Sequence, residues 1–236
     1  SRSHGGYSEY VLSPIRNLIK IPENLNNDLA VFAEPASVAL HAYNVAKKDR
    51  QFDTVIILGL GPIGILLASW CKLNKIKNVI GVDRNQNRFK NFKDLGFKNI
   101  IDTNKDDFSS KLNDYTSNKG VEIAFECSGS VELLNKGILS LSKRGKIIVL
   151  SNQTKDITLD QKILNKFLRQ EIRIVGSWSS VIEPHNEWLE TLDALNSGKF
   201  SIKGLISHKY KFSDAKNIFP DLFEKKFKYS KVLLQP

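Results

Sequence analysis

The sequence predicts an α/β fold built on a doubly wound parallel sheet of about six strands. Short apolar stretches rich in Val and Ile alternate with helical patterns through the middle of the 236-residue chain. Such alternation is typical of parallel strands joined by helices. We expect strands at 54–58, 78–83, 99–102, 121–127, 145–150 and 171–176, and helices at 62–74, 86–95, 106–117, 130–141 and 160–168.

A glycine-rich turn follows the first of these strands and opens the first helix. Its spacing is Gly59-x-Gly61-x-x-Gly64. The first Gly allows a tight turn, the second lets the backbone approach a pyrophosphate, and the third lets the helix pack closely on the strand. Strand, turn, helix and second strand occur in the order that a Rossmann dinucleotide-binding unit requires. An ordinary βαβ unit with a glycine turn is the weaker alternative.

The acid at the end of the second strand bears on the choice of cofactor. Asp83 lies about 20 residues after the last Gly of the motif, where a carboxylate binds the ribose diol of NAD. A carboxylate would also repel the 2′-phosphate of NADP. We therefore predict NAD, although Arg84 and Arg88 lie close by and weaken that preference.

Composition and charge leave several classes of protein open. The formal net charge is +10 and the pI is about 9.5, which raises nucleic-acid binding or steering of an anionic substrate. A solvated surface explains the lysines more simply, so we expect no nucleic acid and no membrane partner. The two cysteines lack metal-ligand spacing, which favours a reduced, cytoplasmic protein.

The flanks do not continue the alternating pattern. We expect a strand over residues 6–14 and a helix at 35–47 before the sheet. After it, we expect helices near 187–195 and 213–225 and strands near 206–210 and 231–234.

Several motifs together resemble the zinc-dependent medium-chain dehydrogenases. They are GGYSEYVL (5–12), AEPASVALHA (33–42), ILGLGPIG (57–64), FECSGS (125–130) and SKVLLQP (230–236). EPASVALHA with a later GSW resembles the polyol dehydrogenase branch, and the tail is similar to the galactitol-1-phosphate 5-dehydrogenases of that branch. The resemblance implies a Rossmann domain at 47–180, flanked by remnants of a GroES-like β catalytic domain at 1–46 and 181–236. Members of the family have a preceding segment with zinc ligands, so we expect the chain to be part of a longer protein.

The resemblance also implies site residues. Glu34 matches a glutamate that approaches or binds the catalytic zinc, although an acid at a helix N-terminus is favourable on dipole grounds alone. The remaining zinc ligands are expected in the preceding segment. His41 and Cys127 are expected to be structural. The positions that match cofactor-binding ones are Gly59, Gly61, Ile63, Gly64, Asp83, Arg88, Leu150, Ser151, Asn152, Gly176, Ser177 and Trp178.

The implied reaction is the reversible, NAD- and zinc-dependent oxidation of a secondary alcohol to a ketone. A sugar-alcohol phosphate is the first choice of substrate. A free polyol, as in sorbitol or L-iditol 2-dehydrogenase, or the substrate of another medium-chain alcohol dehydrogenase comes second. An alternative of another class is a nucleotide-binding redox sensor without hydride chemistry.

The last strand of the sheet bears on assembly. Residues 172–175 follow the last helix of the pattern and are expected at the sheet edge, where an apolar strand needs a partner or a cover. The resemblance implies pairing with a two-fold mate, and we expect a homodimer or a homotetramer built from such dimers.

Overall fold

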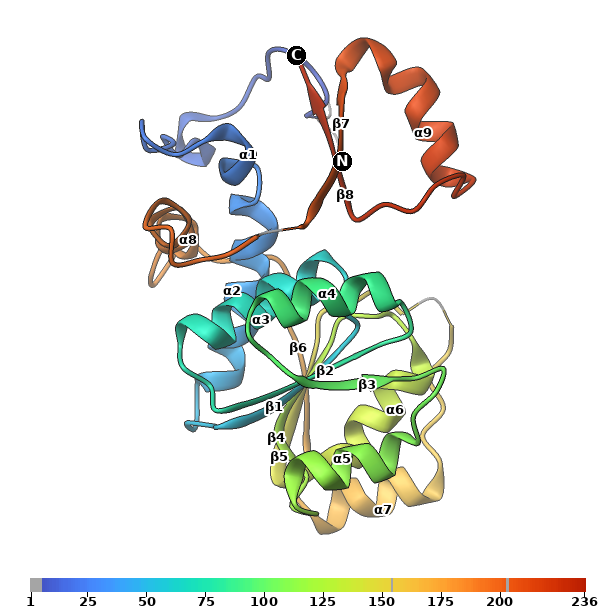
Figure 1. Ribbon diagram of the computed structural model, residues 1–236. Coiled ribbons are helices and arrows are strands. Elements are labelled where there is room, and N and C mark those ends of the chain that lie inside the picture. The colour runs from blue at the N-terminus through green and yellow to red at the C-terminus, as the bar shows by residue number, and fades with distance from the viewer. Residues whose placement is uncertain (1–5, 154, 203) are drawn as a thin grey trace.

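The computed structural model describes residues 6–153, 155–202 and 204–236, and its centre is a six-stranded sheet (Figure 1). The strand order is β3-β2-β1-β4-β5-β6, and every neighbouring pair is parallel. The order reverses direction between β1 and β4, which makes the carboxyl ends of these two strands the switch point of the fold. The strands are β1 (Thr54–Leu58), β2 (Asn78–Asp83), β3 (Asn99–Asp102), β4 (Val121–Glu126), β5 (Leu141–Val149) and β6 (Arg173–Gly176). The doubly wound fold is therefore confirmed.

Helices cover both faces of this sheet (Figure 1). One face carries α2 (Ala33–Lys47), α3 (Pro62–Leu73) and α4 (Gln86–Asp94), and the other carries α5 (Phe108–Thr116), α6 (Val131–Ser140) and α7 (Gln161–Arg169). Alternate residues of β1 enter two separate cores, Val55 and Ile57 on the first face and Ile56 and Leu58 on the second. Burial on both faces explains why the strands are continuous apolar stretches in the sequence.

Polar residues at the helix starts explain where the connecting helices begin. The side chains of Asn85, Asp107, Ser130 and Asp160 each accept a hydrogen bond from a backbone N–H in the first turn of α4, α5, α6 and α7. Such a cap satisfies one of the N–H groups that a helix start leaves unpaired. The expected helix limits differ from the observed ones by two residues at most, as fraying ends allow.

Strand β5 begins four residues before its expected start. Leu141 pairs with Val121, the chain then bulges, and regular pairing resumes at Lys146 opposite Ile123. Lys146 is fully buried, and its Nζ donates to the Ala46 carbonyl at 3.1 Å near the C-terminus of α2. A cation there complements the negative end of the helix dipole.

The flanks hold the remaining elements. These are η1 (Ile15–Asn17), α1 (Asn27–Ala30), α8 (Glu187–Asn196), β7 (Ile206–Lys211), η2 (Phe212–Asp214), α9 (Ala215–Phe223) and β8 (Lys231–Gln235). Strands β7 and β8 form a separate parallel pair. Helix α2 contacts both α3 and α8, which places the later flank beside the earlier one. The proposed domain limits stay a prediction.

The strand expected over residues 6–14 is wrong. These residues pair with no strand in the described part of the chain, and Tyr10 is 91% exposed. A strand needs a neighbour for its backbone N–H and C=O groups, and an apolar pattern alone does not supply one.

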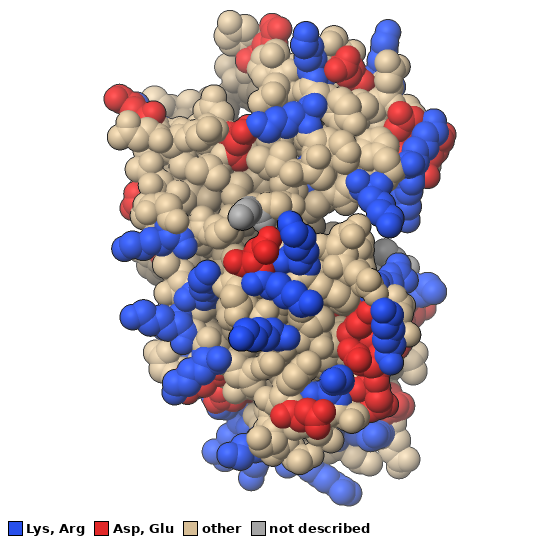
Figure 2. Space-filling model, viewed as in Figure 1, with Lys and Arg blue, Asp and Glu red and all other residues tan. Residues whose placement is uncertain are grey.

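The surface carries charges of both signs (Figure 2). On the face shown, Lys and Arg are spread over the upper and lower parts of the molecule, with acidic side chains between them. They do not form one continuous basic stripe on this face. Within the described ranges, no helix combines the length and the apolar character that a membrane span requires.

Candidate cofactor-binding site

Two glycines of the fingerprint are required by the packing of the protein itself. Gly59 has φ +98°, and a Cβ on it would lie 2.9 Å from the Cβ of Ser128. A Cβ on Gly64 would lie 2.0 Å from the carbonyl oxygen of Gly59. The first glycine thus makes the turn, and the third lets α3 lie directly on it.

Gly61 is different, because nothing in the protein requires it. It caps α3 with φ −66° and ψ −174°, a conformation open to any residue, and apart from its neighbours along the chain no described atom lies within 4 Å of the position its Cβ would take. Pro62 begins the helix, whose first turn leaves N–H groups without intrahelical partners. The empty space beside Gly61 therefore fits a phosphate group bound at a helix N-terminus.

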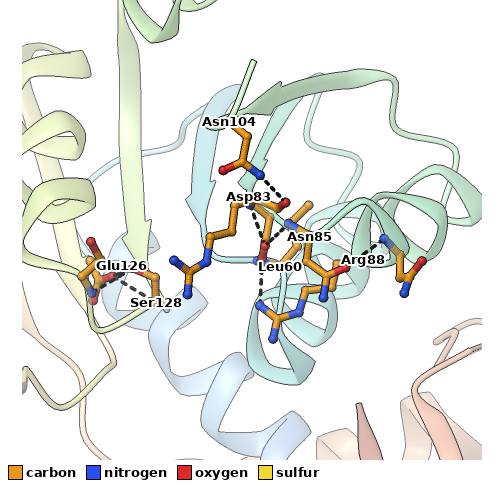
Figure 3. A network of polar contacts seen from close by, with 10 residues as sticks. Leu60, Asp83, Asn85, Arg88, Asn104, Glu126 and Ser128 are labelled. Carbon is orange, nitrogen blue, oxygen red and sulfur yellow. Dashed lines mark hydrogen bonds and ion pairs between the residues drawn. The ribbon is translucent and has the colours of Figure 1, made fainter. Parts of the chain in front are cut away.

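Asp83 lies at the end of β2 with its carboxylate almost fully buried (Figure 3). Its Oδ1 accepts from the N–H groups of Arg84 at 2.7 Å and Asn85 at 2.8 Å. Its Oδ2 accepts from the N–H of Leu60 at 2.8 Å and from Arg88 Nη1 at 3.0 Å. These four donors fill the usual acceptor capacity of a carboxylate. A ribose diol must therefore displace a donor, and the partly exposed Arg88 side chain is the one that can leave without moving backbone.

A cavity of about 560 Å³ connects these features. Gly59, Gly61, Asp83 and Arg88 line one side of it, and the other side is formed by the β4–α6 loop and the start of α6. Arg84 also lines the cavity, so two guanidinium groups face a ligand there and favour an anionic one. Four of the predicted cofactor residues are thus brought together around one cavity.

The predicted residues after β5 and β6 lie at neighbouring strand ends. The Leu150 N–H donates to the Glu126 carbonyl, and the Ser177 N–H donates to the Val149 carbonyl. Gly176 pairs with Val149. The ends of β4, β5 and β6 therefore stand side by side. The hydroxyl of Ser177 is buried and has no hydrogen-bond partner among the described residues.

The remaining predicted cofactor residues are less constrained. Ile63 is the second residue of α3 and is partly buried. Ser151 accepts from the Gly129 N–H at 3.0 Å, which ties the loop after β5 to the loop after β4. Asn152 is exposed, and Trp178 is 77% exposed.

Glu34 lies apart from this group. It is exposed in the first turn of α2, and its carboxylate makes no hydrogen bond or ion pair with any residue that the structure describes. Within the same described ranges, no three His, Cys, Asp or Glu side chains are grouped so that they could hold a metal ion. Because Zn²⁺ takes about four ligands, these residues alone do not form a zinc site.

The surroundings of His41 and Cys127 bear on the structural role that we expect for them. His41 Nδ1 lies 3.1 Å from Oε1 of Glu187, which is fully buried. Cys127 lines the cavity, and burial, together with the charge of Glu126, raises the pKa of its thiol. A protonated thiol is a poor nucleophile.

Sequence reasoning missed Glu126 as a site residue. It ends β4, is fully buried, and accepts hydrogen bonds from the loops after β4 and β5 (Figure 3). The available signal was an acid directly after the apolar residues Ile123, Ala124 and Phe125, at the switch point of the fold.

Comparisons with known proteins agree with this geometry. Sorbitol dehydrogenase of Halalkalibacterium halodurans is 29% identical over 216 residues, which are 91% of this chain and 61% of that protein. D-arabitol-phosphate dehydrogenase of Enterococcus avium is 26% identical over 228 residues, 95% of this chain and 62% of that protein. The chain thus spans about six tenths of the length of these relatives.

A solved structure and a family model also match this chain. The crystal structure of galactitol-1-phosphate dehydrogenase from Escherichia coli superposes with a TM-score of 0.89 at 23% identity, over 100% of this chain and 68% of that one. The family described as "Zinc-binding dehydrogenase" matches residues 62–197, more than half of the chain. This protein therefore belongs to the zinc-binding dehydrogenase family.

Proposed function

We propose that this chain is the NAD-binding part of an enzyme that oxidises a secondary alcohol of a polyol or a polyol phosphate. The observation that carries the proposal is the open space beside Gly61, at the start of α3 and within the same cavity as Asp83. No packing in the protein requires a glycine there. A pyrophosphate that must approach the backbone does require one.

Each part of the candidate site has its own role in this proposal. The turn from Gly59 to Gly64 holds the pyrophosphate, and Asp83, with Arg88 displaced, holds the adenosine ribose. The residues at the ends of β5 and β6, Leu150–Asn152 and Gly176–Trp178, border the nicotinamide. When bound, NAD⁺ supplies the hydride acceptor. The chain itself binds and orients the cofactor.

The substrate proposal rests on the relatives and on the sequence resemblance. The names of the two relatives include a free polyol and a polyol phosphate. We favour a sugar-alcohol phosphate, with a free polyol such as sorbitol as the second choice. The excess of basic side chains would attract the phosphorylated compound more strongly.

We propose that zinc binds only in the full-length protein, because most of its ligands are not among the residues of this structure. Glu34 is free to serve as one ligand or as a neighbour of the metal, and the other ligands would come from elsewhere in the full-length protein. Comparing full-length wild type with Glu34→Ala tests this part. Bound zinc or turnover is expected to fall. Unchanged metal content and rate would remove Glu34 from the site.

The proposal as a whole is tested on the full-length protein in two steps. Calorimetry with NAD and NADP should show tighter binding of NAD, because Asp83 opposes a 2′-phosphate. Formation of NADH is then followed with sorbitol, D-arabitol phosphate and galactitol 1-phosphate in turn. Tighter binding of NADP would contradict the cofactor assignment. Cofactor binding without turnover on any alcohol would instead favour a redox-sensing nucleotide-binding module.

A further inference from the structure

Glu126 is a fully buried carboxylate that joins two loops at the switch point of the sheet. Its Oε1 accepts from Ser128 through the backbone N–H at 2.8 Å and the hydroxyl at 2.5 Å, and from the Gly129 N–H at 3.1 Å. Its Oε2 accepts from the Ser151 hydroxyl and from Gln153 Nε2 at 3.0 Å. One oxygen thus serves the β4–α6 loop and the other serves the β5–α7 loop.

All of these donors are neutral, whereas Asp83 also accepts a hydrogen bond from the charged side chain of Arg88. In the described part of the chain, no Lys, Arg or His forms an ion pair with Glu126. A buried carboxylate is costly unless hydrogen bonds compensate it. Removing it would leave several buried donors of both loops without an acceptor, which costs more than losing one exposed bond. Glu126 therefore joins the two loops, together with the hydrogen bond from the Gly129 N–H to Ser151.

The β4–α6 loop lines the proposed cofactor cavity, and the β5–α7 loop lies next to it through Ser151 and Gln153. The Cys127 N–H donates to the Leu58 carbonyl at 2.9 Å, which sets the β4–α6 loop beside the end of β1. There Ser128 packs so closely on the glycine turn that a Cβ on Gly59 would lie 2.9 Å from it. The β4–α6 loop is thus fixed beside the pyrophosphate turn by its own contacts, and Glu126 ties the β5–α7 loop to it.

Two unpartnered polar atoms mark the same strand ends. Gln153 Oε1 and the Ser177 hydroxyl are buried and have no hydrogen-bond partner among the residues described. Buried polar atoms in native proteins nearly always have a partner. A polar group of a ligand is one such partner, and the bond from Gln153 Nε2 to Glu126 is what leaves the Oε1 atom of this amide free to accept.

We propose that Glu126 is a positioning residue for the nicotinamide half of the cofactor. It holds Ser151 and Gln153 against the β4–α6 loop, so that this border of the proposed nicotinamide site is formed before the cofactor binds. This inference rests on the proposed function. It extends that function, because it divides the site into an adenosine half that is independent of Glu126 and a nicotinamide half that depends on it.

The division can be tested with Glu126→Gln in the full-length protein. A glutamine keeps the shape, but its amide nitrogen cannot accept hydrogen bonds. The N–H groups of Ser128 and Gly129 retain the oxygen, so the nitrogen faces Ser151 and Gln153 and weakens the tie to the β5–α7 loop. We expect NADH to bind about tenfold more weakly, as the loss of a hydrogen bond to a charged group implies. ADP-ribose, which lacks the nicotinamide, should bind within about twofold of wild type.

Glu187→Gln is the matched control. Glu187 is also fully buried and accepts from the Val181 N–H at 2.8 Å and from Asn44 at 3.0 Å, so it also joins distant segments. Unlike the partners of Glu126, its described partners lie in α2 and near residue 181, outside the β4–α6 and β5–α7 loops. The variant should lower the melting temperature without changing the ratio of the NADH and ADP-ribose affinities. A purely structural role of Glu126 would give the same behaviour.

The outcomes separate this inference from the function on which it rests. Equal losses for NADH and ADP-ribose in Glu126→Gln, or no loss for either, would overturn the positioning role. Wild type that binds neither ligand would overturn the proposed function itself. If Glu126→Gln does not fold, Glu126→Asp keeps the charge but shortens the side chain that spans the two loops, and it should weaken NADH selectively in the same direction.

Discussion

Gly61→Ala isolates the contact between the glycine turn and the cofactor. No protein atom lies within 4 Å of the position of the added methyl group, and the φ of −66° is compatible with alanine. Alanine is a poorer N-cap than glycine, by up to about 1 kcal/mol. It also restricts the unfolded chain, which stabilises the fold by about 0.4–1 kcal/mol. These terms oppose each other, so we expect the free energy of unfolding to change by less than about 1 kcal/mol.

Cofactor binding should respond much more strongly. The methyl group occupies the space into which we place the pyrophosphate, and inserting a methyl group into a filled site costs about 1–3 kcal/mol. This corresponds to a loss of affinity for NAD of about 5- to 150-fold. Calorimetric titration with NAD measures the affinity, and thermal denaturation of the same sample measures stability.

Gly64→Ala is the matched variant within the same motif. Its methyl group would lie 2.0 Å from the carbonyl oxygen of Gly59. This oxygen belongs to the backbone, so no side-chain rotation can relieve the clash. We expect a loss of about 3 kcal/mol or more of stability. Wild-type affinity for NAD in Gly61→Ala would refute the pyrophosphate assignment. A stability loss equal to that of Gly64→Ala would show that the space beside Gly61 is not free.

Further predictions concern other parts of the molecule. Asp83→Ala should weaken NAD by about 1–3 kcal/mol in calorimetry, and unchanged affinity would contradict its ribose role. Because burial and the charge of Glu126 raise the pKa of its thiol, Cys127 should react with iodoacetamide at neutral pH more slowly in the folded than in the unfolded protein, as mass spectrometry would show. The hydrogen bond from Lys146 lowers the pKa of Asp49, so the pair stabilises the fold above the ordinary pKa of an aspartate and loses this effect as the pH falls through the lowered value. Lys146→Met should raise the Asp49 pKa in an NMR titration, and an unchanged pKa would contradict the pairing. For assembly we propose a homodimer formed through β6, an edge strand on which Ile174 is 44% exposed. Ile174→Pro should then give a monomer in light scattering, whereas a dimer that persists would exclude this edge.

Local patterns in the sequence determined most of the central fold. Continuous apolar stretches marked the strands, because both of their faces are buried. The right-handed rule for parallel connections then leaves few possible strand orders. The spacing of the glycines and of Asp83 located the candidate cofactor site, because each position is set within one βαβ unit.

Where a residue depends on a distant partner, the sequence was insufficient. The apolar pattern at 6–14 resembled a strand but has no described neighbour to pair with. The early start of β5 depends on the pairing of Leu141 with Val121. Domain limits, cytoplasmic location and assembly remain predictions, because none of them follows from a local pattern or from a contact within one chain.

The difference between local patterns and tertiary contacts is clearest at three charged residues. The sequence predicted a ribose-binding role for the acid at position 83, but only the tertiary structure shows that Arg88 already binds that carboxylate. In the sequence, Glu126 is a charged residue at a strand end, and Lys146 is one inside a strand. Their structural roles depend on Ser151 and Ala46, which are 25 and 100 residues away. Hydrophobic periodicity and motif spacing involve residues that are close together in the sequence, so they can be recognised from the sequence alone. The partner of a buried charge is decided by which segments the folded sheet brings together, because such a charge is stable only where those segments supply its hydrogen bonds.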